Sequence, residues 1–249
     1  MLAIFCLRLA AGLVICLVLL SPTQVNPRFF RTHFLTALAL TCVAAVFVRD
    51  VAEMWLWALL MFAMVLAALG SMTWMLEDAP GGRPLITLTS PVLLAALALA
   101  GYELRDQGEP WWLLLDDLTS AAMLGSATTA MLIGHSYLLA PAMSLTPLLR
   151  LLAALAASIV LRIGITIVGL WLWTDAQGGT TLDNEMMLWL AVRWGIGFVG
   201  PLVLAWLAWE TTRIRATQSA TGILYVVVIL CFLGELTSQL LLTRTGYTL

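Results

Sequence analysis

Apolar stretches about as long as a membrane span recur along the whole chain, and this recurrence restricts the fold more than any other feature. A helix needs roughly 20 apolar residues to cross a bilayer, and eight runs near that length are separated by segments with turn chemistry. The run at 111–139 is so long that its helix must tilt, kink or lie partly in the interface. We expect helices at about 2–20, 34–48, 51–76, 86–104, 111–139, 149–173, 186–209 and 223–245.

Composition supports the same fold class. Hydrophobic residues make up 62% of the 249 residues and charged residues only 10%, against about 25% charged in soluble domains. Such a chain has too few polar side chains to cover a water-facing surface, and no segment is polar enough for a separate soluble domain. The predicted fold is one all-α domain over 1–249, a polytopic integral membrane bundle of about eight transmembrane helices. Membrane lipids are its expected surroundings, and no nucleic acid is expected as a partner.

Arginine is distributed unevenly between alternate loops, and this bias sets the expected orientation. Loops with an excess of basic residues stay in the cytoplasm. On that rule both termini are extracytoplasmic, and the chain belongs in a bacterial inner membrane. Arg8, near the amino end, argues against this orientation. The arginines expected on the cytoplasmic side are Arg28, Arg31, Arg83, Arg150, Arg213 and Arg215.

Ionisable side chains inside the predicted spans are the main candidates for function. Each costs about 2.5–3.5 kcal/mol at the centre of a span on insertion scales, so such groups persist when they are paired, hydrated or used. With a rise of about 1.5 Å per residue, acidic and basic groups from five helices fall at two matching depths in the outer half of the bilayer. The candidates for a proton path or a quinone site are Asp116, Asp117, Arg162, Arg193, Glu235 and Gln239.

These groups suggest a path with two levels. Asp116 and Asp117 are expected at the outer lip, balanced by Arg193 and by Arg8. Arg162 and Glu235 are expected deeper, each at the head of a polar stripe that repeats every three or four residues and faces the bundle interior. The alternative interpretation is structural, because a buried ion pair is not by itself evidence of a function.

Two histidines near the cytoplasmic ends of their helices are candidates for a cofactor or headgroup contact. His33 opens the second predicted helix and His135 lies near the end of the fifth. Two imidazoles on different helices are the minimum for bis-histidine haem ligation, so the sequence allows a single haem b, a quinone or lipid-headgroup contact, or two packing residues. No motif for a metal site is present.

The letters GIGFVG at 195–200 match a dinucleotide fingerprint, but their setting does not. That fingerprint requires a preceding strand and a later acid that binds the ribose, whereas these residues lie within a predicted span. Their glycines permit close helix approach, and Pro201 can kink the helix. We therefore expect a bend or a cavity beside Arg193.

These observations favour a non-catalytic membrane subunit over an enzyme that acts alone. The helix count, the external termini and the buried acid–base groups resemble the quinol-handling anchor subunits of bacterial molybdoenzymes of the polysulfide, nitrite and dimethyl-sulfoxide reductase type. This resemblance, which covers helix count and topology, implies a membrane subunit of an electron-transfer complex with quinone contact or a proton path, and other protein subunits as partners. The two alternatives are a structural or assembly subunit and a small-solute or proton transporter.

Overall fold

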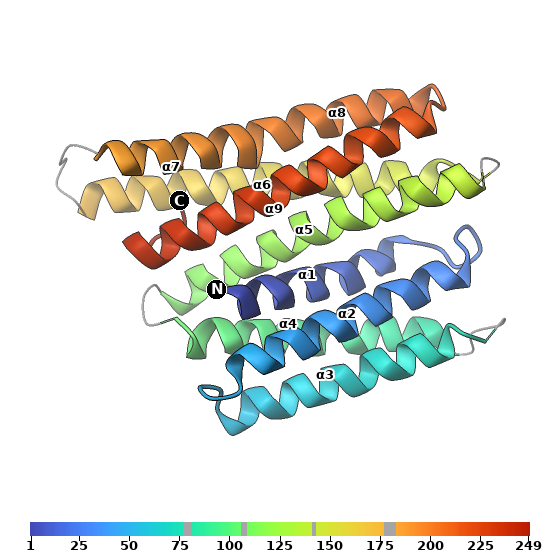
Figure 1. Cartoon of the computed structure of the whole chain (residues 1–249), viewed down its shortest axis with the longest axis horizontal. Helices are drawn as coiled ribbons and strands as arrows, with labels where there is room; N and C mark the ends of the chain where they lie inside the picture. Colours follow the sequence, from blue (N-terminus) through green and yellow to red (C-terminus); the bar gives the residue numbers. More distant parts are fainter. Residues whose placement is uncertain (77–80, 106–108, 141–142, 177–182) are drawn as a thin grey trace.

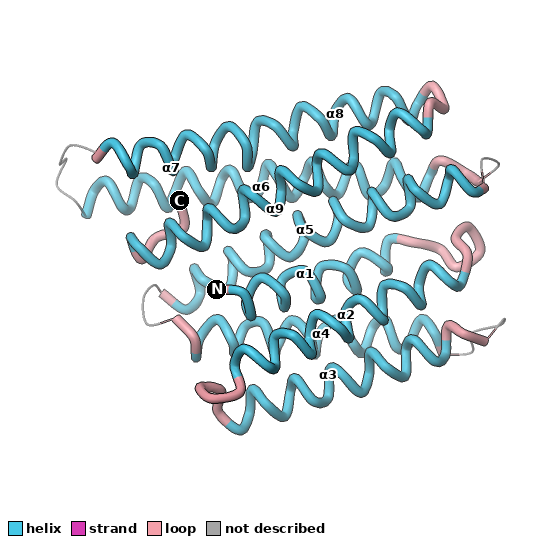
Figure 2. The backbone as a smooth tube through the Cα atoms, in the orientation of Figure 1, coloured by secondary structure: helices cyan, strands magenta, loops and turns pink. Residues whose placement is uncertain are grey.

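The computed structural model describes residues 1–76, 81–105, 109–140, 143–176 and 183–249, and these residues contain helices and no strand. Figure 1 shows the helices side by side along one direction, with both termini at the same end. The described loops lie at the two ends of this bundle (Figure 2). The helices are α1 (Leu2–Cys16, extended by a 3-10 turn at Leu17–Leu19), α2 (Pro27–Val48), α3 (Met54–Thr73), α4 (Gly82–Glu103), α5 (Pro110–Leu139), α6 (Thr146–Ala176), α7 (Asn184–Trp194), a π-helical segment (Gly195–Val199), α8 (Gly200–Arg213) and α9 (Thr217–Thr245).

Seven helical segments in the described chain are long and apolar enough to cross a membrane, and α7, the π-helical segment and α8 together count as one of them. The helix α5 is not among these seven although it contains 30 residues. Hydroxyl and carboxyl side chains along α5 lower its hydropathy, and many of them are buried in the bundle. The sequence therefore predicted the multi-pass character, and α5, the long helix that is not among the seven apolar segments, packs against α1, α4, α6 and α9.

The helices form two halves with the same internal arrangement. In the N-terminal half, α1 contacts α2 and α4, and α3 closes the group by packing between them. In the C-terminal half, α5 contacts α6 and α9, and α8 closes the group in the same way. The two halves meet along α1 and α5, which lie next to each other in the middle of Figure 1.

Glycines allow this central contact to be close. A Cβ atom on Gly12 of α1 would overlap the backbone oxygen of Ala121 on α5, and one on Gly125 would overlap the backbone of Gly12. The two helices are thus in backbone contact, a geometry that small residues permit between membrane helices. This contact fixes α1 and α5 relative to each other.

Some helix ends differ from the expected ones because polar residues continue the helices beyond their apolar centres. The helix α2 begins at Pro27, well before the expected residue 34, since the Asn26 side chain caps it by accepting a hydrogen bond from the Arg28 N–H at 2.9 Å. Proline at the first position also favours a helix start. The helix α9 likewise begins at Thr217 rather than at 223, whereas α3 is shorter than expected.

The sequence predicted a bend or a cavity beside Arg193, and the structure has a π-helical segment directly after this residue. Residues Gly195–Val199 widen the helix between α7 and α8, and the chain stays helical through Pro201. A Cβ on Gly197 would lie 3.0 Å from the Cα of Gly234 on α9, so this segment packs closely on α9. Single π turns often occur at functional sites, and this one directly follows Arg193.

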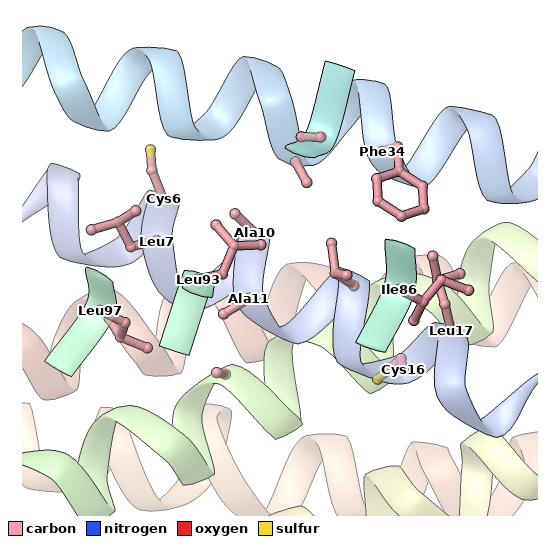
Figure 3. Packing of buried hydrophobic residues seen from close by; sticks show 14 of the residues in the cluster. Cys6, Leu7, Ala10, Ala11, Cys16, Leu17, Phe34, Ile86, Leu93 and Leu97 are labelled. Carbon is pink, nitrogen blue, oxygen red and sulfur yellow. The ribbon is translucent and has the colours of Figure 1, made fainter. Parts of the chain in front are cut away.

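The core of the N-terminal half is largely apolar. Figure 3 shows Leu7 and Ala10 of α1 beside Leu97 and Leu93 of α4, and Phe34 of α2 pointing toward α1 farther along that helix. All five are buried. Dispersion contacts among such groups hold membrane helices together, because lipid chains are as apolar as the side chains themselves.

Candidate functional site

A closed ring of alternating charges lies inside the bundle, between the two halves. Its members come from four helices: Arg8 (α1), Asp116 (α5), Arg162 (α6) and Glu235 (α9). Each arginine pairs with both carboxylates, and each carboxylate pairs with both arginines. The four side chains are fully buried or nearly so. We call these four residues the charge ring.

Arg8 makes the most contacts in the charge ring. Its guanidinium donates to Asp116 and Glu235 and, through Nε, to Oδ1 of Asp117 at 2.8 Å. The Nη1 group of Arg8 also lies 3.3 Å from the Ser120 hydroxyl. Arg8 therefore balances the adjacent aspartates from inside the protein and does not extend to the surface.

Arg162 closes the opposite side of the charge ring. It donates from Nη2 to Oε2 of Glu235 at 2.9 Å and from Nη1 to the backbone oxygen of Asp116 at 2.8 Å. The same Nη1 lies 3.0 Å from Oδ1 of Asp116, but outside hydrogen-bond geometry. Among the described residues, Oδ1 of Asp116 therefore has no hydrogen-bond donor. A buried oxygen of this kind can accept a proton or a water molecule.

Asp117 links the charge ring to the end of the bundle that holds both termini. Its second partner is Arg105, directly after α4, which donates from Nη2 to Oδ1 at 2.8 Å. Gly101 leaves room for the carboxylate, because a Cβ there would lie 2.6 Å from Oδ2. The sequence did not single out Arg105, since it lies outside the apolar run, yet its side chain is only 10% exposed.

A cavity of about 200 Å³ opens beside these groups, at the start of α1 and the ends of α4 and α9, on the side that the sequence predicts to be extracytoplasmic. Arg105 and Gln239 contribute its polar wall, and each is bonded to a carboxylate: Arg105 to Asp117, and Gln239 Nε2 to Oε1 of Glu235 at 3.3 Å. The Oε1 atom of Gln239 has no partner among the described residues. We call this space the outer cavity; its lining is Met1, Ile4, Leu104, Arg105, Gln239, Leu242 and Thr243.

Arg193 is buried, but its partners differ from those that the sequence predicted. The prediction that it balances Asp116 and Asp117 is wrong, because those carboxylates pair with Arg8, Arg105 and Arg162. Arg193 instead donates to two backbone oxygens, that of Gly234 at 2.9 Å and that of Leu249 at 3.2 Å. Its guanidinium carbon lies 4.1 Å from the ring centroid of Phe198. No carboxylate side chain in the described chain forms an ion pair with it.

The two histidines do not form a shared site. His33 is fully buried, with Nδ1 2.9 Å from the backbone oxygen of Phe29 one turn earlier in α2 and its ring against the Phe29 ring. His135 lies on the exposed side of α5, with Nδ1 3.5 Å from the Tyr225 hydroxyl of α9. A haem needs two imidazoles that face each other across its plane. The different surroundings of these two do not fit that arrangement.

The site therefore joins a connected set of buried acids and bases to an opening at one end of the bundle. Comparison with known protein families, with curated proteins and with solved structures finds no match to this chain. The arrangement of Arg8, Asp116, Arg162 and Glu235 can hold protons and shift them between neighbouring oxygens, and the outer cavity gives a ligand access to Arg105 and Gln239.

Proposed function

We propose that this protein is a membrane subunit of a bacterial electron-transfer complex, and that it exchanges protons with a quinone bound in the outer cavity. In this proposal all eight expected helices span the inner membrane, with both termini extracytoplasmic. One observation carries the proposal: Arg105 and Gln239, both in the wall of the outer cavity, are each hydrogen-bonded to a buried carboxylate.

The outer cavity suits a quinone headgroup. Ile4, Leu104 and Leu242 supply apolar walls for the ring, and small-molecule sites combine such walls with a few fixed polar groups. Arg105 can donate a hydrogen bond to one quinone oxygen. The unpartnered Oε1 of Gln239 can accept the O–H of a quinol.

The two carboxylates behind the outer cavity, Asp117 and Glu235, then take part in the proton transfer. Oxidation of a quinol to a quinone releases two protons and two electrons. Asp117 and Glu235 lie one hydrogen bond behind the outer cavity, so they can take up protons and return them to the outer side. The two electrons pass to a haem or iron–sulfur centre of a partner subunit, since the side chains here supply acid–base chemistry rather than redox chemistry.

Binding of a fluorescent quinol analogue to the purified protein in nanodiscs tests the cavity. Thr243 is exposed at its wall, so Thr243→Trp fills the space without changing a network residue, and Thr243→Val is the matched control. We expect Thr243→Trp and Gln239→Leu each to weaken binding about tenfold or more, the loss of roughly one buried hydrogen bond or contact. Unchanged affinity in both variants would contradict the proposal.

Two further measurements separate this function from the alternatives. Gentle purification should bring down a haem or iron–sulfur protein, and a structural subunit would show such a partner without any quinol binding. A transporter would instead carry protons or a solute across vesicles that contain only this chain, and Arg162→Leu would abolish that flux. Flux of this kind without quinol binding would replace the proposal.

A further inference from the structure

We propose that the protein binds the phosphate of an anionic phospholipid at the start of α4, at the end of the bundle opposite the charge ring. A hollow of about 370 Å³ lies there. The expected orientation puts this end in the cytoplasm. The lining residues are Pro22, Thr23, Trp74, Gly81, Gly82, Arg83 and Pro84.

The first turn of α4 borders the hollow, and no hydrogen bond joins its Gly82 and Arg83 N–H groups to another described residue. Gly81 adopts a left-handed conformation with φ of 84° and precedes the first helical residue, Gly82. Pro84 has no N–H, and the N–H of Leu85 is bonded to the backbone oxygen of Gly81 at 3.1 Å. The N–H groups of Gly82 and Arg83 thus remain at a helix start, where the helix dipole also favours an anion.

Trp74 supplies an independent donor at the same place. The residue is 3% exposed, and its indole Nε1 has no hydrogen-bond partner among the described residues. A Cβ on Gly82 would lie 2.7 Å from Cε2, the ring atom bonded to Nε1. The indole ring therefore lies against the first residue of α4, and its Nε1 is one bond from an atom in this contact. A buried indole normally has an acceptor, and a phosphate oxygen bound at this helix start would be one.

The Trp74 ring is held in place by its neighbours. It stacks on Phe30 of α2, with ring centroids 4.3 Å apart and planes 15° apart. Because the ring is fixed and Gly82 is flush against it, the donor is already positioned before a ligand arrives. Arg83, which is exposed, adds a positive charge next to the same N–H groups.

The surroundings favour a lipid over free phosphate. Met72, Met75 and Leu76, at the end of α3 beside Trp74, are 66%, 68% and 57% exposed. An acyl chain can cover these side chains while the headgroup occupies the hollow. Free phosphate would leave them uncovered. Anionic lipids are also attracted to basic residues at the cytoplasmic surface.

Lipid titration of the full chain in detergent tests this site. Retained lipid is counted by native mass spectrometry with phosphatidylglycerol, phosphatidylcholine or inorganic phosphate as the probe. We expect phosphatidylglycerol to bind and to raise the melting temperature. Trp74→Phe keeps the stacked ring but removes the N–H, and Arg83→Gln removes the charge. Each should weaken phosphatidylglycerol binding about tenfold, as for a lost hydrogen bond to a charged group.

Controls make the result decisive. Arg150→Gln removes an exposed arginine from the same end of the bundle, on α6, and should leave binding unchanged. The proposal is overturned if Trp74→Phe and Arg83→Gln bind phosphatidylglycerol like the wild-type protein, or if inorganic phosphate binds as tightly as the lipid. Quinol-analogue binding in the outer cavity should be the same in all three variants, so the two proposals fail independently.

Discussion

The two halves of this protein share an arrangement of helices but differ in the number of charged side chains that they bury. In the half built from α1 to α4, the core is largely apolar, as Figure 3 shows around Leu93 and Leu97. In the half built from α5 to α9, Asp116, Arg162 and Glu235 are buried between the helices. Apolar packing is thus present in both halves, and the C-terminal half also contains paired charges.

Arg8 links the two halves through its ion pairs. It is a residue of the apolar half, yet its guanidinium reaches Asp116 and Asp117 on α5 and Glu235 on α9. Burying charges is costly unless each has a partner, so the charged half depends on a residue of the apolar half for balance. The two halves thus have the same pattern of helix contacts, but the C-terminal half needs Arg8 of the N-terminal half to balance its buried carboxylates.

The largest predicted loss of stability comes from removing a buried carboxylate of the C-terminal half. Glu235→Leu leaves Arg8, Arg105 and Arg162 against two carboxylates, and breaking a buried pair costs about 3–5 kcal/mol. We expect a loss of that size in the free energy of unfolding, measured by denaturant titration in mixed micelles. Glu210→Leu is the control, because the Glu210 side chain is 46% exposed and an exposed pair contributes about 1 kcal/mol or less. Equal losses in both variants would show that the charge ring does not stabilise the fold.

A substitution at the contact between α1 and α5, which we call the seam, should give the next largest loss in the free energy of unfolding. Gly12→Ala places a methyl group against the backbone of Ala121 and Gly125, and backbone atoms cannot move aside as a side chain can. We expect destabilisation of about 3 kcal/mol, the upper end for overpacking, measured by the same unfolding titration. A stability within error of wild type would mean that α1 and α5 do not need their backbone contact.

The apolar half should respond to cavities rather than to charge. Leu93 is fully buried in its core, so Leu93→Ala removes contacts without altering any ion pair. We expect a loss of about 2 kcal/mol, the low end for such a truncation, because lipid rather than water surrounds the unfolded helices. The quinol analogue should bind this variant as it binds wild type; a tenfold loss there would show that the halves are coupled through more than Arg8.

The smallest expected effect on stability is at Gly164. Its substitution is the matched control for Gly12→Ala. Gly164 lies in α6, and a Cβ built on it meets no atom within 4 Å. Gly164→Ala should therefore stabilise the protein by up to about 1 kcal/mol through helix propensity alone. In the same unfolding titration, the changes in the free energy of unfolding for Gly164→Ala and for Gly12→Ala should have opposite signs. A loss at both sites would mean that helix packing is uniformly tight rather than concentrated at the seam.

The sequence alone predicted the helical, multi-pass character and the burial of the charges. Hydropathy over about 20 residues is a property of the chain itself, and so is the polar stripe that Glu235 shares with Ser238 and Gln239. A charge inside an apolar run has few places to go other than the interior. Arg162 and Glu235 are paired as the sequence suggested.

Only the tertiary structure decided which charges meet. Arg8 and Glu235 are separated by 227 positions, and their contact depends on how α1, α5 and α9 are rotated and placed side by side. Depth along a helix suggested Arg193 as the partner of the aspartates, but depth does not specify direction around the helix, and Arg193 points to the Gly234 carbonyl instead. Arg105 reaches Asp117 because α4 ends beside α5. Hydropathy varies along one dimension, whereas partner choice depends on helix packing in three.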